Sequence, residues 1–374
     1  MTGPGGHASG RVTLFLCGDV MTARGIDQVL PHPGDPELRE PVACSALDYV
    51  ALAQWKNGHI SRPVDFAYCW GAALEELERA GPDARIINFE TSVTRSHDFA
   101  RKSIHYRMHP DNVGVLTAAG IDCCVLANNH VLDLGRAGLV ETLDVLQGAG
   151  LVTVGAGRDR AEAEAPAILD LGAGRRVLVF AFGASSSGVP RGWGATADRP
   201  GVSVLEATSV DDIAARIRGV RRPGDLVVAS IHWGGNWGYE VPREQLDLAR
   251  ALVGEAGVDV VHGHSSHHFK AIEVHRGKPI FYGCGDFLND YEGIEGYEGF
   301  RSELVLMYLV TLEVATGRLE RLELVPLRIA RMRLERPSPD DARWVRERLA
   351  RECGRFGARV EPNATGGLEL GWSA

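Results

Sequence analysis

The stretch VDVVHGHSSHHFKAIEVHRGKPIFYGCGDFLNDY, residues 258–291, alternates short apolar runs with polar loops. The runs VDVV and KPIFY are rich in β-branched and aromatic residues, which is typical of buried strands. Each run is followed at once by glycine and by side chains that titrate or bind metal. Chemistry at the ends of strands is typical of α/β proteins, so this stretch predicts an α/β fold.

Further runs extend the same pattern along the chain. The strands predicted are residues 11–17, 85–89, 121–126, 151–154, 176–182 and 225–231, with a late hairpin of residues 303–314 and 318–327. The helices predicted are residues 66–80, 136–147, 243–256 and 340–353. The proline-rich segment 25–63 is predicted to be irregular. Alternating strands and helices followed by hairpins indicate two packed sheets flanked by helices.

Composition limits the classes of function. The 374 residues are 45% hydrophobic and 24% charged, with a formal net charge of −9, as in ordinary globular proteins. No stripe rich in Lys and Arg is present, which argues against a nucleic-acid partner. The start MTGPGGHASG resembles no signal peptide, and no run approaches the ~18 apolar residues of a membrane span. We therefore expect a soluble, cytoplasmic protein without membrane insertion; the oligomeric state is not indicated.

Polar residues lie at the C-terminal ends of five of the predicted strands. They supply two carboxylates, amides and four imidazoles: Asp19, Asn88 and Glu90, Asn129 and His130, His232, and His264 with His267. If the strand ends meet, they form a concave cluster of the kind found in one- or two-metal hydrolytic centres. Asp286, at the next strand end, either adds a carboxylate or caps a turn.

The loop between Thr91 and Pro110 is the one basic, histidine-rich loop of this acidic chain. Arg95 and Arg107 in this loop either bind a carboxylate or phosphate of a substrate or are simply solvated. Trp233, next to His232, is either an apolar wall for a substrate or part of the core.

Six motifs occur in order: GDVMTARGID, NFETSV, ANNHVLDLGRAGLVETLDVL, HWGGNWGYEVP, DVVHGHSSHHFKAIEV and PIFYGCGDFLND. Together they resemble the CapA family, named for poly-γ-glutamate capsule synthesis, of the calcineurin-like metallophosphoesterase superfamily. The resemblance covers residues 12–327 and implies a four-layered α/β/β/α sandwich. We expect a flexible N-terminus (residues 1–10), a CapA/metallophosphoesterase-like catalytic domain (residues 11–335) and a C-terminal helical extension (residues 336–374) packed on it.

The resemblance also implies roles for individual residues. Glu90 is similar to the superfamily's bridging carboxylate and Asn129 to its metal-binding asparagine. His130 is similar to its catalytic histidine, and His232 and His264 or His267 to its later histidine ligands. The superfamily's opening Asp-x-His is Asp19-Val20-Met21 here, and its Gly-His-x-His is opened to His264-Ser265-Ser266-His267. A thioether is a poor ligand for a hard divalent ion, so a single metal or none is expected.

The loss of one ligand favours a metal-independent enzyme without a cofactor. The chain resembles some soluble CapA-like proteins of peptide natural-product pathways, and this resemblance implies the preferred prediction: a peptide epimerase that moves a Cα proton in a ribosomal precursor peptide of the lasso-peptide type. Its predicted catalytic residues are Asp19, Glu90, His130, His264 and His267. Its predicted substrate-binding residues are Asn129, His232, Trp233, Arg95, Arg107 and Asp286.

Two alternatives remain. The first is a hydrolase of phosphoester or amide bonds that uses one or two Mn, Fe or Zn ions, held by Asp19, Glu90, Asn129, His232 and His264. The other is an accessory protein of poly-γ-glutamate synthesis. In each case the expected partner is a peptide or polyglutamate-like chain, or a phosphoester for the hydrolase.

Overall fold

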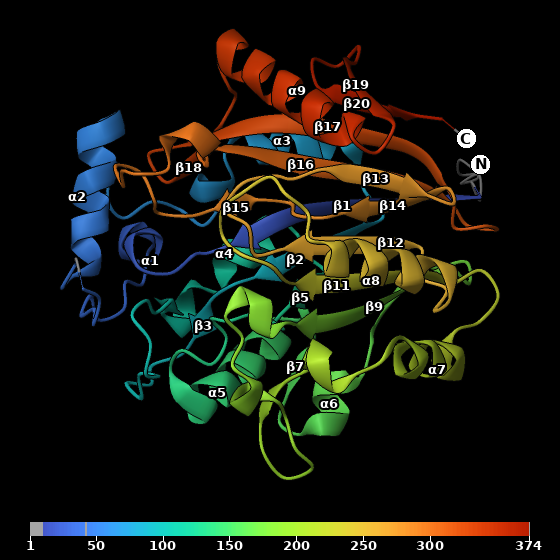
Figure 1. The fold of residues 1–374 in the computed structure, drawn as a ribbon. Coiled ribbons are helices and arrows are strands. Elements are labelled where there is room, and N and C mark those ends of the chain that lie inside the picture. Colours follow the sequence, from blue (N-terminus) through green and yellow to red (C-terminus); the bar gives the residue numbers. More distant parts are fainter. Residues whose placement is uncertain (1–9, 42, 374) are drawn as a thin grey trace, which may run out of the picture.

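Two β-sheets packed face to face form the centre of the molecule (Figure 1). The computed structural model describes residues 10–41 and 43–373. The predicted flexible N-terminus, residues 1–10, therefore lies outside the described residues except for Gly10.

The larger sheet has ten strands. They are β1 (Arg11–Val20), β2 (Ala84–Phe89), β5 (Cys123–Val125), β6 (Val152–Val154), β15 (Asp286–Leu288), β16 (Leu304–Glu313), β17 (Leu319–Ala330), β18 (Arg333–Glu335), β19 (Ala358–Pro362) and β20 (Leu368–Trp372). Their order is β19-β20-β17-β16-β1-β2-β5-β6, with β15 also paired to β1 and β18 to β17. The strands β1, β2, β5 and β6 run parallel, so their carboxyl ends share one edge.

The smaller sheet has six strands in the order β13-β14-β12-β11-β9-β8. They are β8 (Ala167–Asp170), β9 (Arg176–Gly183), β11 (Leu226–His232), β12 (Val260–His264), β13 (Ile272–His275) and β14 (Lys278–Phe281). Two short ribbons pair β3 (Ser92–Val93) with β4 (Arg107–Met108), and β7 (Ala156–Gly157) with β10 (Gly201–Val202). The strands β9, β11, β12 and β14 run parallel, as the buried apolar runs predict.

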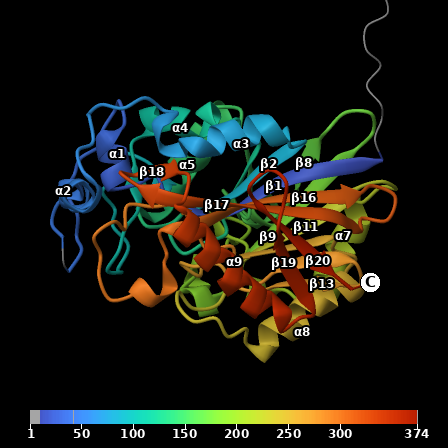
Figure 2. The same ribbon diagram turned by 90° about the horizontal axis from the view of Figure 1, so that it is seen from above.

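Helices cover the outer faces of both sheets (Figure 2). The α-helices are α1 (Gly25–Val29), α2 (Ala46–Asn57), α3 (Ala72–Ala80), α4 (Gly114–Ala118), α5 (Gly135–Gly148), α6 (Arg160–Glu164), α7 (Val210–Val220), α8 (Arg243–Gly254) and α9 (Pro339–Gly354). Short 3₁₀ turns are Tyr68–Trp70, Pro110–Asn112, Ser185–Ser187, Arg191–Trp193, Leu205–Ala207 and Glu298–Phe300. Helices α1 to α5 pack on the larger sheet, and α7 and α8 pack on the smaller one.

Alternation along β1 shows how the layers are built. Leu14 and Leu16 point into the core between the two sheets, whereas Phe15 and Cys17 point to the helices on the outer face. Successive side chains of a strand face opposite sides, so an unbroken apolar run fills two cores at once. The result is the four-layered α/β/β/α sandwich predicted from the sequence.

Three segments differ from the predictions. The segment 25–63 is not simply irregular, because it contains α1 and α2. Helix α7 was not predicted. The C-terminal extension is not only helical: after α9, the strands β19 and β20 form a hairpin that joins the edge of the larger sheet. In the part of the chain that the structure describes, none of the helices combines the length and hydrophobicity needed to cross a lipid bilayer.

Candidate functional site

Strand ends from both sheets meet at one site. In the larger sheet, Asp19 on β1 pairs in register with Asn88 on β2 and with Asp286 on β15. In the smaller sheet, His232 on β11 pairs with His264 on β12. The Nδ1 atom of His264 lies 3.8 Å from Oδ1 of Asp19, so the two sheets contribute to a single buried cluster, the strand-end site.

The backbone around Asp19 is unusually close-packed. A Cβ atom at Gly18 would lie 1.7 Å from the carbonyl oxygen of Gly285, so a side chain there would separate β1 from the chain beside it. The N–H of Asp19 donates to that same oxygen at 2.9 Å. Ser265 is buried with φ of 100°, and its N–H donates to Oδ2 of Asp19 at 3.2 Å. Such strained backbone is typical of functional sites.

The first group of possible metal ligands comprises Asp19, His232 and His264, whose ligand atoms lie within 4.8 Å of one another. All three side chains are buried. The two Nδ1 atoms of the histidines face each other at 2.9 Å. Asn88 donates to Oδ1 of Asp19 at 2.7 Å, and Oδ1 of Asn129 lies 3.0 Å from Nε2 of His232. These contacts fix the orientations of both the carboxylate and the imidazoles.

The second group comprises Asp19, His267 and Asp286, again with ligand atoms within 4.8 Å of one another. Nδ1 of His267 lies 2.9 Å from Oδ1 of Asp286, and Asn289 donates to the other oxygen of Asp286 at 2.8 Å. Met21, which stands where the superfamily has a histidine, packs in a small apolar cluster. His267 and Asp286 therefore supply ligand atoms that the sequence motif at Met21 lacks.

Glu90 and His130 lie beside these groups. One carboxylate oxygen of Glu90, Oε1, is 3.7 Å from Nε2 of both His130 and His232. The other, Oε2, is buried and has no hydrogen-bond partner among the described residues. Nδ1 of His130 lies 2.6 Å from Asp133, which also forms an ion pair with Lys102 at 2.8 Å. The orphaned oxygen marks a place where a cation or a donor is missing.

Burial and mutual repulsion shift the titration of the cluster. Burial, and then the charge of Asp286, raises the pKa of Asp19 to about 7. Burial, and then the charges of Asp19 and Asp286, also raises the pKa of Glu90. Burial lowers the pKa of His232 and of His264, so both imidazoles are neutral near pH 7. His267 differs, because the charge of Asp286 raises its pKa against the effect of burial. The carboxylates of Asp19 and Glu90 lie beside the two neutral imidazoles and have less positive charge near them.

This donor set fits one or two divalent cations. Carboxylate, amide and neutral imidazole atoms are the ligands that Mn, Fe and Zn accept, and the unpartnered Oε2 of Glu90 adds a free oxygen. Asp19 belongs to both ligand groups, so it has the position of a bridging ligand, a role that the resemblance assigns to Glu90. A bound cation would lower the pKa values of the carboxylates and remove their repulsion.

The structure brings together most of the predicted site residues. Those that meet are Asp19, Glu90, Asn129, His130, His232, His264, His267 and Asp286. Trp233 does not join them: it is 3% exposed in the core of the smaller sheet and donates to the carbonyl oxygen of Tyr282. The prediction that Trp233 forms a substrate wall is therefore wrong, because it points to the face of β11 opposite His232.

Arg95 and Arg107 also lie apart from the strand-end site. Arg95 is exposed and forms ion pairs with Asp111 at 3.0 Å and Glu141 at 3.6 Å. Arg107 donates to the carbonyl oxygen of Asp35 at 2.8 Å. Within the described residues, neither arginine forms an ion pair or hydrogen bond with the strand-end carboxylates, and their contact with a substrate stays a prediction.

Lys102 and Asp133 contribute to the site although the sequence did not assign them to it, whereas Asn88 belongs to the strand-end residues expected there. Asp133 follows His130 by three residues in NNHVLD, a spacing that places both on one side of a turn. Lys102 lies in the basic loop, and Nζ reaches the carbonyl oxygen of Asn129 at 2.5 Å. The spacing of Asp133 was a readable signal, whereas nothing in the loop sequence distinguished Lys102 from its basic neighbours.

Comparisons with known proteins agree with the motifs. A family described as "Bacterial capsule synthesis protein PGA_cap" matches residues 13–291. A "Probable polyglutamine synthesis accessory protein" of Mycobacterium tuberculosis is 49% identical over 364 residues, which cover 96% of each chain. The "PGA biosynthesis protein CapA" of Bacillus subtilis is 30% identical over 235 residues, covering 62% of this chain and 59% of the relative.

One solved structure was also matched. It is described as a novel phosphatase from Mycoplasma pneumoniae, with a TM-score of 0.48 and 12% identity over 87% of this chain and 95% of that chain. The relatives reported above are named as an accessory protein and as a biosynthesis protein, and neither is named as an epimerase. This finding overturns the preferred prediction of a peptide epimerase.

Proposed function

Because the chain belongs to the PGA_cap family of bacterial capsule synthesis proteins, we propose that it is an accessory protein in the synthesis of a polyglutamate-type polymer. Its strand-end site binds one or two divalent cations and, together with them, the polymer chain. The mycobacterial relative, which matches 96% of this chain, carries polyglutamine synthesis in its name and supports this assignment.

The observation that carries the proposal is the shared position of Asp19. Its carboxylate belongs both to the group with His232 and His264 and to the group with His267 and Asp286. One buried carboxylate between two sets of ligands is the arrangement found in two-metal sites. The cations supply the positive charge that the site itself lacks, and they leave positions open for oxygen atoms of a bound chain.

The polymer has suitable chemistry for such a site. An amide-linked glutamate chain carries one carboxylate per residue as well as amide oxygens, and hard divalent cations prefer oxygen ligands of both kinds. Without a cation, the carboxylates of Asp19, Glu90 and Asp286 repel a polyanion. Binding of the polymer is therefore expected to depend on the metal.

Metal and polymer binding can be measured separately. Wild-type protein stripped with chelator is titrated with Mn²⁺, and a γ-linked glutamate decamer is then added. At a free Mn²⁺ concentration about a hundredfold above Kd, we expect Mn²⁺ to increase the free energy of unfolding by about 2.7 kcal/mol. The decamer should bind only the Mn²⁺-loaded protein. The chain length of the decamer, followed in the same samples, reports any cleavage.

The variant Asp19→Asn removes the shared ligand. It should lose both the Mn²⁺-dependent stabilisation and decamer binding. The matched control is Asp247→Asn, which removes the same charge from the 66%-exposed side chain on α8. Equal binding of the decamer with and without chelator, or in Asp19→Asn and wild type, would contradict the proposal.

A further inference from the structure

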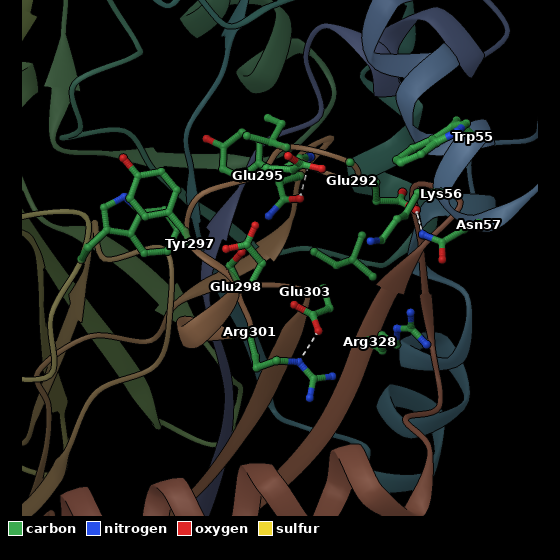
Figure 3. Close-up of a pocket in the computed structure, with 17 residues that line it drawn as sticks. Trp55, Lys56, Asn57, Glu292, Glu295, Tyr297, Glu298, Arg301, Glu303 and Arg328 are labelled. Atoms are coloured by element: carbon green, nitrogen blue, oxygen red, sulfur yellow. Dashed lines mark hydrogen bonds and ion pairs between the residues drawn. The ribbon is translucent and has the colours of Figure 1, made fainter.

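A cavity of about 420 Å³ opens beside the strand-end site. It lies between the end of α2, the segment 289–303 and strand β17 (Figure 3). None of the residues predicted to form the site lies in its wall. Its size is that of a pocket for a small organic molecule or for several residues of an extended chain.

The cavity and the strand-end site share a wall. Asn289 lines the cavity and donates to Asp286 at 2.8 Å. Tyr291 and Trp237 also line it, and their rings lie 5.3 Å and 5.4 Å from the ring of His267. The cavity therefore adjoins the second group of possible ligands.

Aromatic side chains form two sides of the cavity. Trp237 stacks on Tyr297 at 4.1 Å with an interplanar angle of 7°, and on the other side Trp55 of α2 is 72% exposed. Among the described residues, large apolar side chains are seldom this exposed: six are found, and Trp55, Ile294 and Tyr297 all line this cavity. A cluster of exposed apolar surface marks a binding site.

Two cations of the cavity form no ion pair with a residue that the structure describes. Arg328 on β17 forms no ion pair among the described residues, and its Nε is buried without a hydrogen-bond partner. Lys56 at the end of α2 likewise forms neither an ion pair nor a hydrogen bond there. Arg301 differs, because Glu303 and Asp341 already neutralise it. A half-buried guanidinium without a carboxylate is costly until an acceptor binds it.

The acidic residues of the cavity limit the kind of ligand. Glu292 accepts hydrogen bonds from the N–H groups of Arg331 and Met332 and is thus occupied. Glu295 and Glu298 line the cavity without an ion pair among the described residues, although Glu298 accepts a hydrogen bond from the N–H of Gly296 at 2.8 Å. A polyphosphate would be repelled by these two carboxylates, and a purely apolar ligand would leave Arg328 unpaired. A chain that offers both carboxylates and amide N–H groups can pair with Arg328 through its carboxylates and with the glutamates of the cavity through its N–H groups.

We propose that this cavity is a second binding site for the amide-linked glutamate chain, continuous with the strand-end site. The inference rests on the proposed function, which it extends along the chain. Carboxylates of the chain bind Arg328 and Lys56, its methylene groups lie on Trp55 and Tyr297, and its amide N–H groups donate to the glutamates of the rim. The cavity thereby selects long chains over short ones.

Oligomers of two lengths test the proposal. A γ-linked glutamate dimer is short enough for the strand-end site alone, whereas a decamer reaches the cavity. Binding of both to Mn²⁺-loaded full-length protein is measured by calorimetry for wild type, Arg328→Gln and Lys56→Gln. The control is Arg243→Gln, which removes the same charge from the 90%-exposed side chain on α8. Melting temperature and Mn²⁺ affinity report whether each variant folds and keeps its metal site.

We expect Arg328→Gln to weaken decamer binding by about tenfold or more, the usual effect of a charge-assisted hydrogen bond. Dimer and Mn²⁺ binding should stay at wild-type values, and Arg328→Lys should restore part of the decamer affinity. Unchanged decamer binding in both Arg328→Gln and Lys56→Gln would overturn the cavity proposal while leaving the proposed function intact. Failure of wild type to bind either oligomer would overturn both.

Discussion

Two buried polar clusters lie close together in this protein and differ in how their charge is balanced. In the first, the guanidinium of Arg24 donates hydrogen bonds to Asp290 and to both carboxylate oxygens of Glu40, the latter two at 3.1 and 3.2 Å. Each of these three residues is at most 7% exposed. In the second, the strand-end site, Asp19 and Asp286 are equally buried. Within the described residues, neither of these two aspartates forms an ion pair with Lys or Arg.

The difference indicates distinct purposes. The cluster around Arg24 is complete: a guanidinium faces two carboxylates, and Tyr49 packs 3.9 Å from it and donates to Glu40. Such a cluster holds the segment around Arg24, after β1, against the segment around Asp290. The strand-end site pairs Asp286 with His267, whose pKa the charge of Asp286 raises against the effect of burial, but it gives Asp19 no Lys or Arg partner among the described residues. An external cation would remove the remaining repulsion between its acids.

Breaking the Arg24 cluster should have the largest effect on folding. Arg24→Met leaves Glu40 and Asp290 buried without their cation, which costs about 3–5 kcal/mol of the free energy of unfolding. Denaturant unfolding measures the loss. Arg24→Lys keeps the charge but not the planar fork, so its loss should be smaller.

The matched change in the strand-end site is Asp19→Asn, which should stay within about 1 kcal/mol of wild type in chelator at about pH 4, where the folded Asp19 carboxyl still holds its proton. A comparable loss in Asp19→Asn and Arg24→Met would mean that both clusters are structural.

The two clusters should also respond differently to pH. Asp19 has a folded-state pKa raised to about 7 by burial and by Asp286, against an unfolded value of about 3.9. Between these values the folded chain holds a proton that the unfolded chain has released. The contribution of Asp19 is therefore fully present below about pH 4 and is lost as pH rises to about 7, by up to about 1.4 kcal/mol per pH unit.

A comparison of two proteins isolates this effect. His232 and His264, whose pKa values burial lowers, stabilise the fold in the opposite direction as pH rises towards about 6.5. Both histidines are retained in Asp19→Asn, so the difference in free energy of unfolding between wild type and variant reports the Asp19 carboxyl. Measured in chelator, wild type should lose stability relative to Asp19→Asn from about pH 4 to 7. A flat difference would contradict the raised pKa.

Much of the fold is readable from the sequence because strands buried on both faces form unbroken apolar runs. Helix α2 could not be predicted from an apolar pattern, because Leu47, Leu52 and Trp55 are exposed and the helix has no single apolar face. The capping box of Ser45 and Asp48 is the sequence feature that could have predicted the start of this helix. Of the three exposed residues, Trp55 lines the cavity beside the site, so the end of this helix contributes to a surface feature rather than to the core.

The site is readable to the extent that parallel strands bring their ends to one edge. The alternation of β11 could also have excluded Trp233, because successive side chains of a strand face opposite sides and His232 faces the site. Loops have no such rule. The sequence between Thr91 and Pro110 offers several cations, and only the folded path of the loop determines that Lys102 reaches Asp133.

The smallest predicted change in the free energy of unfolding concerns this exposed loop, in contrast to the two buried clusters. Arg95→Ala removes an exposed ion pair with Asp111, and such pairs contribute about 0–1 kcal/mol because water and salt screen them. We expect the free energy of unfolding to change by less than about 0.5 kcal/mol and Mn²⁺-dependent decamer binding to stay at the wild-type value. Lys102→Ala is the informative partner, since it removes the cation beside buried Asp133 and should lower both quantities. If Arg95→Ala weakened decamer binding as much as Lys102→Ala does, the bound chain would have to extend over the exposed face of this loop.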